Sequence, residues 1–322
     1  MTQMMTSERT DQASMHRWLT RQALPATVYR LLVIAAAAAC GVVYLQALPI
    51  AQADDGTQGL TLLLAGSPIV AVLWLATLTA VTAMVALAIT AIGRPGAGIF
   101  VVAVGLSVAV ASAGSVDGWL RRSDGTSLYW YFAAEMLIWA VLWMAILLIV
   151  YQFNAYLQYL APDRVEGVAE GKAEASARTW WGAADAMEGR SGIGAELQAG
   201  LICVVLGSLG VALLVRTADW PQVLWGVGIS YFLAGLISHQ ISPVRNPVVF
   251  LCAPLVAGFA WYLYIATQGA GHTVLLYNYF TGQYWPAGLV MPGYYASAGV
   301  AGVMLGRGWS QGMLRQHWLG EV

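Results

Sequence analysis

The stretch that decides the fold, Pro68 to Val116, reads PIVAVLWLATLTAVTAMVALAITAIGRPGAGIFVVAVGLSVAVASAGSV. It contains two apolar runs, 68–92 and 97–116, separated only by Gly93, Arg94, Pro95 and Gly96. Each run is close to the roughly 20 apolar residues that a helix needs to cross a bilayer core. Because the connection is so short, we predict an antiparallel pair of neighbouring transmembrane helices.

The composition of the whole chain points to the same environment. Hydrophobic residues make up 59% of the sequence and charged residues 10%, whereas about a quarter of the residues in soluble domains are charged. We therefore predict an all-α fold, a polytopic helical bundle whose main partner is the lipid bilayer. The net charge of −1 gives no reason to expect a nucleic-acid partner. Cys40, Cys203 and Cys252 lie in apolar runs, so we expect no disulfide, metal site or cofactor.

Eight segments approach the length of a spanning helix, namely 31–48, 68–92, 97–116, 128–151, 197–215, 221–237, 248–267 and 286–305. The expected organisation is therefore an N-terminal segment (1–30), a first four-helix half (31–151), a polar linker (152–196), a second four-helix half (197–306) and a C-terminal tail (307–322). A duplication stays open, because the proline-flanked turns at Arg94 and Arg245 that the halves share are also common in unrelated short turns.

The basic residues predict the orientation, because lysine and arginine are retained on the cytoplasmic side. With the N-terminus inside, the opposite side receives only Arg121, Arg122 and Arg216 of the 15 basic residues. Both termini and the linker are therefore expected in the cytoplasm, with the bundle in a bacterial-type inner (plasma) membrane.

The first segment has a second interpretation. Arg17, Arg21 and Arg30 precede it, and the sequence 51–53 that follows it resembles a signal-peptidase site. Cleavage there would leave seven helices and an external N-terminus.

Glu135 is the one acidic residue within a predicted span, where an ionised carboxylate is costly. Tyr131 and Trp139 lie one helical turn before and after it, which makes these three residues a candidate intramembrane polar site. The functional interpretation is a proton or cation site that faces the bundle interior. The alternative is a protonated or hydrogen-bonded glutamate that fixes one helix contact.

The predicted external loop at 268–286 is rich in aromatic residues and contains no lysine or arginine. Its candidate binding residues are His272, Tyr277, Tyr279, Tyr284 and Trp285. Aromatic faces and hydroxyl groups suit a sugar, a quinone-like ring or a partner protein. The alternative is the ordinary belt of aromatic residues at a membrane boundary.

Ala298, Gly302 and Gly306 share one face of the last predicted helix. Small residues at this spacing allow two helix backbones to approach closely. They predict a packing contact, either within the chain or with a second copy or another protein.

Two function classes follow from these features. The first is a permease or permease subunit for a small molecule or an ion, in which Glu135 is the ionisable element. The alternative is a non-catalytic scaffold or membrane subunit of a larger complex. The sequence has no phosphate loop, His-Glu-x-x-His pair or Gly-x-Ser-x-Gly elbow, so enzyme activity is the least favoured class.

Overall fold

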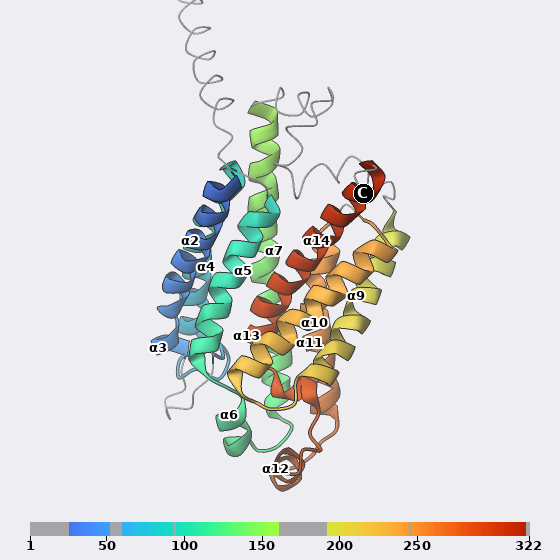
Figure 1. Ribbon diagram of the computed structural model, residues 1–322. Helices are drawn as coiled ribbons and strands as arrows, with labels where there is room; N and C mark the ends of the chain where they lie inside the picture. The colour runs from blue at the N-terminus through green and yellow to red at the C-terminus, as the bar shows by residue number, and fades with distance from the viewer. Residues whose placement is uncertain (1–25, 52–59, 93–94, 161–191, 245, 320–322) are drawn as a thin grey trace, which may run out of the picture.

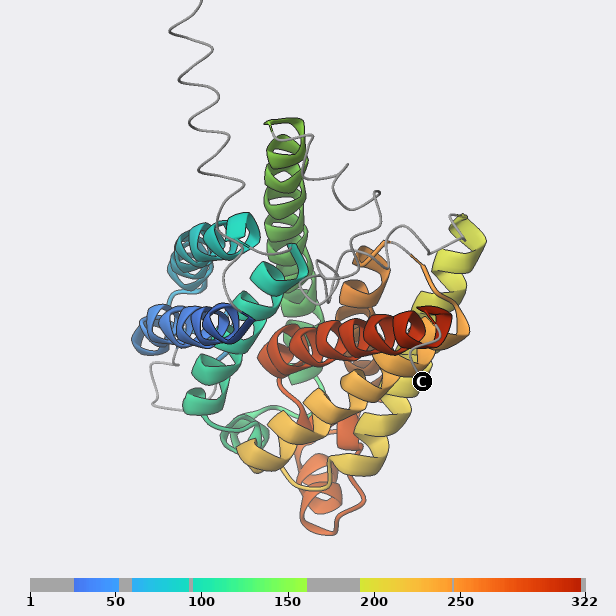
Figure 2. The ribbon, with the colours of Figure 1, turned by 45° about the horizontal axis from the view of Figure 1, so that its top comes forward.

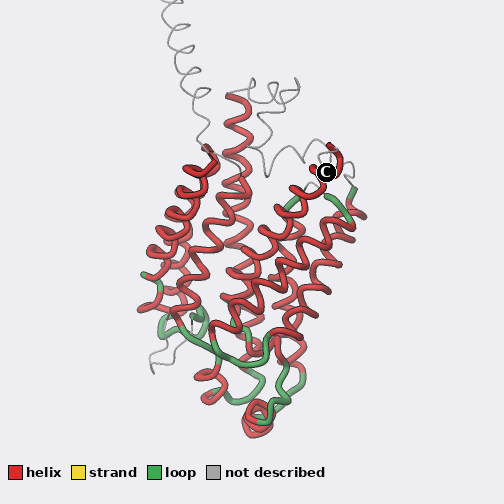
Figure 3. Tube along the Cα trace, viewed as in Figure 1, coloured by secondary structure: helices red, strands yellow, loops and turns green. Residues whose placement is uncertain are grey.

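The computed structural model describes residues 26–51, 60–92, 95–160, 192–244 and 246–319. Over these residues the chain consists of helices and connecting loops. The long helices run side by side (Figure 1), and most of the loops gather at the end of the bundle that carries α12 (Figure 3). We refer to this end as the α12 end.

The chain before residue 161 forms one group of helices. Its members are α2 (Ala26–Leu45), α3 (Leu48–Ala51), α4 (Pro68–Ile92), α5 (Pro95–Ala113), α6 (Asp117–Arg122) and α7 (Leu128–Leu160). The chain after residue 191 forms α9 (Ile193–Leu214), α10 (Trp220–Ile241), α11 (Val248–Thr267), α12 (His272–Phe280), the 3-10 turn η3 (Pro286–Leu289), α13 (Pro292–Tyr294), the π-helical turn η4 (Tyr295–Gly299) and α14 (Val300–Leu319).

Seven of the described helices are long and apolar enough to cross a membrane: α2, α4, α5, α7, α9, α10 and α11. The protein is therefore a polytopic membrane protein with a helical bundle fold. The predicted hairpin is present, because α4 and α5 pack against each other closely. A Cβ atom at Gly98 of α5 would lie only 2.5 Å from the carbonyl oxygen of Ala86.

The expected eighth spanning helix differs from the prediction, and the count of eight is not confirmed. We expected one helix over 286–305, but residues 286–289 form a 3-10 turn and the α-helical path begins at Pro292. It continues through η4 and α14 to Leu319, beyond the point where we expected a tail to begin. The physical reason is twofold. Prolines fix two starting points in the segment, and α14 carries Arg307 and Gln311, which lower its hydropathy.

Only some of the other expected segment boundaries fall within the described residues. α7 continues to Leu160 and α9 begins at Ile193, so both ends of the expected linker are helical. Residues 161–191 lie outside the described part of the chain, as do residues 1–25 and most of the signal-peptidase-like sequence at 51–53.

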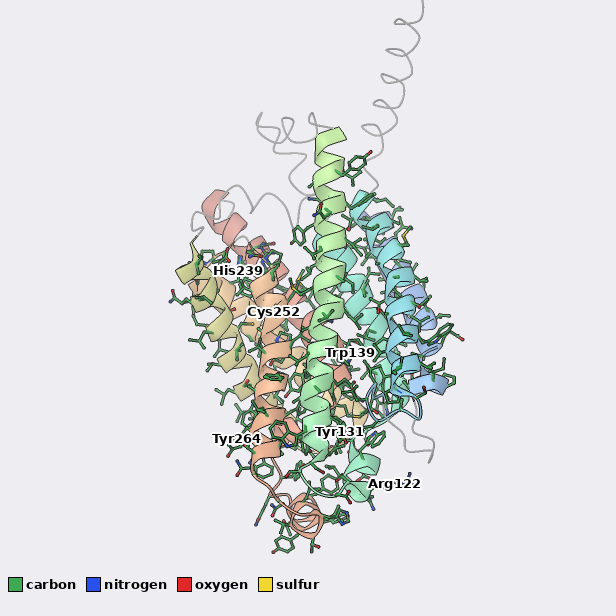
Figure 4. The ribbon with its side chains drawn as sticks, turned by 180° about the vertical axis from the view of Figure 1, so that it is seen from behind. Arg122, Tyr131, Trp139, His239, Cys252 and Tyr264 are labelled. Carbon is green, nitrogen blue, oxygen red and sulfur yellow. The ribbon has the colours of Figure 1, made fainter. Side chains whose placement is uncertain are left out.

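α7 and α14 connect the two groups of helices. α7 contacts α4 on one side and α11 on the other, and lies between the two groups when the bundle is seen from behind (Figure 4). α14 crosses over α10 (Figure 2). A Cβ atom at Gly302 or Gly306 would collide with the backbone carbonyl of Gly228 or Phe232, so these glycines permit the approach of α14 to α10 within the chain.

Candidate functional site

The carboxylate of Glu135 lies fully buried on α7 and accepts two hydrogen bonds. Oε2 accepts the backbone N–H of Leu62 at 2.9 Å, and Oε1 accepts the indole N–H of Trp139 at 3.2 Å. Tyr131 does not join this group. Its side chain is 51% exposed and lies nearer the α12 end than Trp139 (Figure 4). The structure therefore joins two of the three residues of the predicted intramembrane site and adds a backbone donor.

That donor belongs to a segment that contains no helix. Residues 60–65, here called the first buried segment, precede α4, and Leu60, Thr61 and Leu62 are almost completely buried. A non-helical backbone inside a membrane protein needs partners for its N–H groups, because lipid supplies none. The Glu135 carboxylate supplies one of them.

A second buried segment, residues 284–291, lies between α12 and α13 and contains η3. Here the backbone groups that need partners are carbonyls. The hydroxyl of Tyr129 on α7 donates to the carbonyl oxygen of Gly288 at 2.8 Å, and the hydroxyl of Tyr262 on α11 donates to that of Val290 at 2.6 Å. The Tyr129 hydroxyl also hydrogen-bonds the hydroxyl of Tyr284. Both groups of helices therefore contribute to the contacts of this segment.

The helix that follows the second buried segment is irregular. Residues 295–299 form the π-helical turn η4, and the indole N–H of Trp143 on α7 donates to the carbonyl oxygen of Ala296 at 2.8 Å. Directly opposite lies Pro254, a proline inside α11, since a Cβ atom at Gly299 would lie 2.8 Å from its Cβ atom. Both a π-turn and an internal proline interrupt regular helical hydrogen bonding, and such breaks recur at functional sites and hinges.

Buried tyrosine rings connect these elements. The ring centroids of Tyr129 and Tyr262 are 5.9 Å apart, those of Tyr262 and Tyr295 are 5.9 Å apart, and those of Tyr295 and Tyr231 are 6.3 Å apart. The row begins at Tyr129, which hydrogen-bonds Tyr284, and its members come from α7, α11, η4 and α10. All four side chains are completely buried, so this part of the core is packed.

The α12 end carries two cavities that share Thr217 and Asp219 in their walls, and we call them together the vestibule. The larger has a volume of about 640 Å³ and is lined by Gly114, Ser115, Thr217, Asp219, Trp220, Pro221 and Gln222. The smaller has a volume of about 310 Å³ and is lined by Arg121, Arg216, Thr217, Ala218, Asp219, Tyr279, Phe280, Gly282, Tyr284 and Leu289. Each cavity therefore has residues of both groups of helices in its wall.

Only part of the predicted aromatic loop lines the vestibule. Tyr279 and Tyr284 line the smaller cavity, whereas the side chain of Tyr277 is 62% exposed. His272 contacts the carbonyl oxygen of Arg121 through Nε2 at 3.1 Å. The Trp285 ring packs on that of Tyr284, with centroids 5.7 Å apart. The five predicted residues therefore share one end of the bundle, but only two of them face the vestibule.

Charged residues in and beside the vestibule have distinct partners. Asp117 Oδ2 accepts the Nε–H of Arg121 at 2.9 Å, and the Arg121 guanidinium lies over the Phe280 ring, 5.3 Å from its centroid. Burial and the nearby Asp117 carboxylate raise the pKa of Tyr279 to about 12, so its hydroxyl stays protonated at neutral pH. Arg216 and Asp219 lie in the connection between α9 and α10.

Most of the vestibule is not predicted by the sequence. Asp117 and Asp219 belong to no motif, and Arg121 and Arg216 serve only in the count of basic residues. The signal that was present is that Arg121, Arg122 and Arg216 are the only basic residues expected on the α12 side, within loops that also carry acids. The hydroxyl contacts of Tyr129 and Tyr262 gave no signal, because their partners are backbone carbonyls.

A second polar group lies at the opposite end of the bundle, where the sequence placed no site. His239 Nδ1 and Ser310 Oγ are 2.9 Å apart, and Arg307 Nη2 donates to the carbonyl oxygen of Val244 at 3.4 Å. The first contact joins α10 to α14, and the second joins α14 to the connection between α10 and α11. Within the described residues, no group of three His, Cys, Asp or Glu side chains is arranged to hold a metal ion.

Comparison with known proteins identifies no relative: no family model, curated protein or solved structure matches this chain.

Proposed function

We propose that this protein is a small-molecule permease whose substrate first binds in the vestibule at the α12 end. The observation that carries the proposal is that both cavities lie between residues of the two groups of helices. In many transporters the substrate site lies at the interface between two halves, near the bilayer midplane, and the halves rock or open around it. The vestibule would be the entrance to such an interface. In this proposal the α12 end faces the outside, in agreement with the sparse basic residues expected on that side.

The irregular path from residue 284 to residue 299 supports the same function. The second buried segment lies beside the smaller cavity through Tyr284 and Leu289, and the π-turn η4 follows it. Non-helical backbone at membrane depth is tolerated where it is buried in protein or lines a path. A segment held by a few tyrosine hydroxyls is therefore a suitable moving part beneath the vestibule.

Glu135 has a different role in this proposal from the one expected from the sequence. Its carboxylate holds the first buried segment and the Trp139 indole, and it is absent from the walls of both vestibule cavities. These contacts fit a glutamate that fixes a structural contact. The substrate site of the proposed permease is therefore the vestibule.

The packed core of buried tyrosine rings favours the alternative function, a scaffold or membrane subunit, because such a protein needs no path through its core. The two functions differ in whether the segment around η4 becomes accessible. Ser297 lies in η4 and is completely buried, so a reagent reaches it only when the bundle opens.

The test is cysteine labelling in sealed vesicles, which requires no knowledge of the substrate. The native Cys40, Cys203 and Cys252 are replaced by alanine, and a membrane-impermeant maleimide is added on the α12 side. The matched variants are Thr217→Cys in the vestibule wall and Ala103→Cys, which is buried in α5. A permease predicts that Ser297→Cys is labelled slowly, at a rate between those of the two controls. A rate equal to that of Ala103→Cys would refute the permease and support the scaffold.

A further inference from the structure

We propose that the smaller cavity of the vestibule binds a small zwitterion, a molecule that carries one carboxylate and one ammonium group, as a free α-amino acid does. This inference rests on the proposed function, because it names the substrate class of the same vestibule. It is carried by two opposite charges in one cavity wall that do not neutralise each other.

The positive group is the guanidinium of Arg216. Its Nε–H donates to the carbonyl oxygen of Leu213 at 3.2 Å, which fixes the side chain at the end of α9. No described acidic residue lies within ion-pair distance of it, in contrast to Arg121, which is paired with Asp117 at 2.9 Å. Arg216 therefore offers its remaining N–H groups to an anion, and a guanidinium pairs well with a carboxylate.

The negative group is the carboxylate of Asp219, only three residues further along the chain. Its Oδ2 accepts the hydroxyl of Thr217 at 2.9 Å, and no described basic residue forms an ion pair with it. Arg216 and Asp219 both line the smaller cavity, yet they do not pair with each other. A ligand with both charges can satisfy both groups at once.

The connection that carries these two residues is ordered by its own hydrogen bonds. The Oε1 atom of Gln222 accepts the backbone N–H of Thr217 at 2.8 Å, and the backbone N–H of Asp219 donates to the Thr217 hydroxyl at 3.3 Å. The charged groups are thus held in place before a ligand arrives, which lowers the entropy cost of binding.

The size and the remaining wall agree with a small ligand that has an apolar part. The cavity volume of about 310 Å³ is at the lower end of the range of about 300–1,000 Å³ for small-molecule sites. Tyr279, Phe280 and Leu289 supply aromatic and apolar surface on the side formed by the aromatic loop. Arg216 and Asp219 are both exposed, so a ligand with a single charge keeps only one of the two charge-assisted contacts and binds more weakly than a zwitterion.

The test measures binding of phenylalanine to the full-length protein in lipid nanodiscs by calorimetry. The comparison ligands are 3-phenylpropionate, which lacks the ammonium group, and phenethylamine, which lacks the carboxylate. We expect each to bind about tenfold more weakly than phenylalanine, because each loses one charge-assisted hydrogen-bonded contact. Equal binding of the three ligands, or no detectable binding of phenylalanine, would overturn the proposal.

Two variants test which protein charge binds which charged group of the ligand. Arg216→Gln should abolish the preference for phenylalanine over phenethylamine and keep the preference over 3-phenylpropionate, and Asp219→Asn should do the reverse. Arg30→Gln, an exposed arginine of α2, is the matched control and should bind as the wild type does. Equal loss of all three ligands in both charge variants, with unchanged elution in size-exclusion chromatography, would contradict the assignment.

The same charges occur in the headgroup of an ethanolamine lipid. Glycerophosphoethanolamine is therefore a further ligand in the test, and tighter binding of it than of phenylalanine would refute the free amino acid in favour of a lipid headgroup. The inference and the proposed function can fail separately. Phenylalanine binding without labelling of Ser297→Cys would keep the site and reject the permease, whereas labelling without binding would reject the zwitterion.

Discussion

Two largely buried segments of this protein do not form an α-helix, and they are held by opposite kinds of hydrogen bond. In the first, residues 60–65, a backbone N–H donates to the carboxylate of Glu135 at 2.9 Å. In the second, residues 284–291, backbone carbonyls accept the hydroxyls of Tyr129 and Tyr262 at 2.8 and 2.6 Å. Each segment is followed by a helix with a proline in its first turn, Pro68 in one case and Pro292 in the other.

The two sets of hydrogen bonds differ in the free energy that their loss costs, so the two segments should differ in rigidity. Releasing the buried Glu135 carboxyl group leaves its two oxygens and two N–H donors without partners, and each unpaired buried polar group costs about 1–3 kcal/mol, so the first segment is fixed. The second segment is held by separate hydroxyl–carbonyl hydrogen bonds from two helices, and the loss of either one leaves the other in place, so each costs less to break. The second segment also lies beside the vestibule, so it is the one that we expect to move.

The largest expected effect is on stability when the carboxylate is removed. Glu135→Leu leaves the N–H groups of Leu62 and Trp139 without an acceptor, and each unpaired buried donor costs about 1–3 kcal/mol. We therefore expect the free energy of unfolding in detergent to fall by about 3 kcal/mol. Glu135→Gln keeps one acceptor oxygen and should lose about half as much.

The control for this prediction is Tyr131→Phe, one turn away on the same helix, which should stay within about 0.5 kcal/mol of the wild type. If Glu135→Leu unfolds at the denaturant concentration of the wild type, the two hydrogen bonds carry no stability. Glu135 would then regain the ionic role that its position in the sequence suggested.

The next effect is the loss of the Tyr129 hydroxyl, which has two partners, Gly288 and Tyr284. We expect Tyr129→Phe to lower the free energy of unfolding by about 1.5 kcal/mol, near the upper limit observed for hydrogen bonds between helices in membranes. The ring remains in place, so its contact with Phe132, at a centroid distance of 5.5 Å, should persist. A loss as large as that in Glu135→Leu would remove the distinction between a fixed and a movable segment.

The sequence predicted the helices better than the segments between them. The bounds of α4 and α11 agree with the expected runs 68–92 and 248–267, because apolar length and a proline at or just before the first turn define them. Asn246, just before α11, accepts the backbone N–H of Val248 through Oδ1 at 3.1 Å. These features are local, so a single chain segment contains all the information.

The site could be predicted only in outline, because its parts come from distant segments. Glu135 was recognised as unusual, but its partner Leu62 acts through a backbone N–H that leaves no trace in the side-chain sequence. The run 286–305 looked like one helix because it is apolar throughout. Its prolines mark where the break occurs, but the hydroxyl donors that satisfy the carbonyls of the broken segment come from α7 and α11, 159 and 28 residues away along the chain. Nothing in the sequence links Arg216 and Asp219 to a site. The structure does, because aromatic residues of α12 line the same cavity.

Variants that loosen the two segments should also differ in their effect on the opening of the bundle. In the Ser297→Cys background, Tyr129→Phe should raise the labelling rate about tenfold, which corresponds to about 1.4 kcal/mol in favour of the open state. Glu135→Gln should change the rate by less than about twofold, because the first segment does not lie beside the vestibule. The measurement is maleimide labelling from the α12 side at matched protein concentration. Equal acceleration by both variants would mean that general loosening, and not the second segment, controls access.

The smallest effect is expected for Tyr262→Phe. Its hydroxyl has a single partner, the carbonyl oxygen of Val290, and hydrogen bonds of this kind in membranes contribute about 0.6 kcal/mol on average. Tyr264→Phe, two residues along the same helix and 48% exposed, removes a hydroxyl from a side chain outside the core and should have no measurable effect. The two variants are compared by their midpoints of thermal unfolding. If Tyr262→Phe matches Tyr264→Phe, the hydrogen bond from Tyr262 to Val290 carries no measurable stability, and the hydroxyl of Tyr129 on α7 is the more important of the two donors to the second segment.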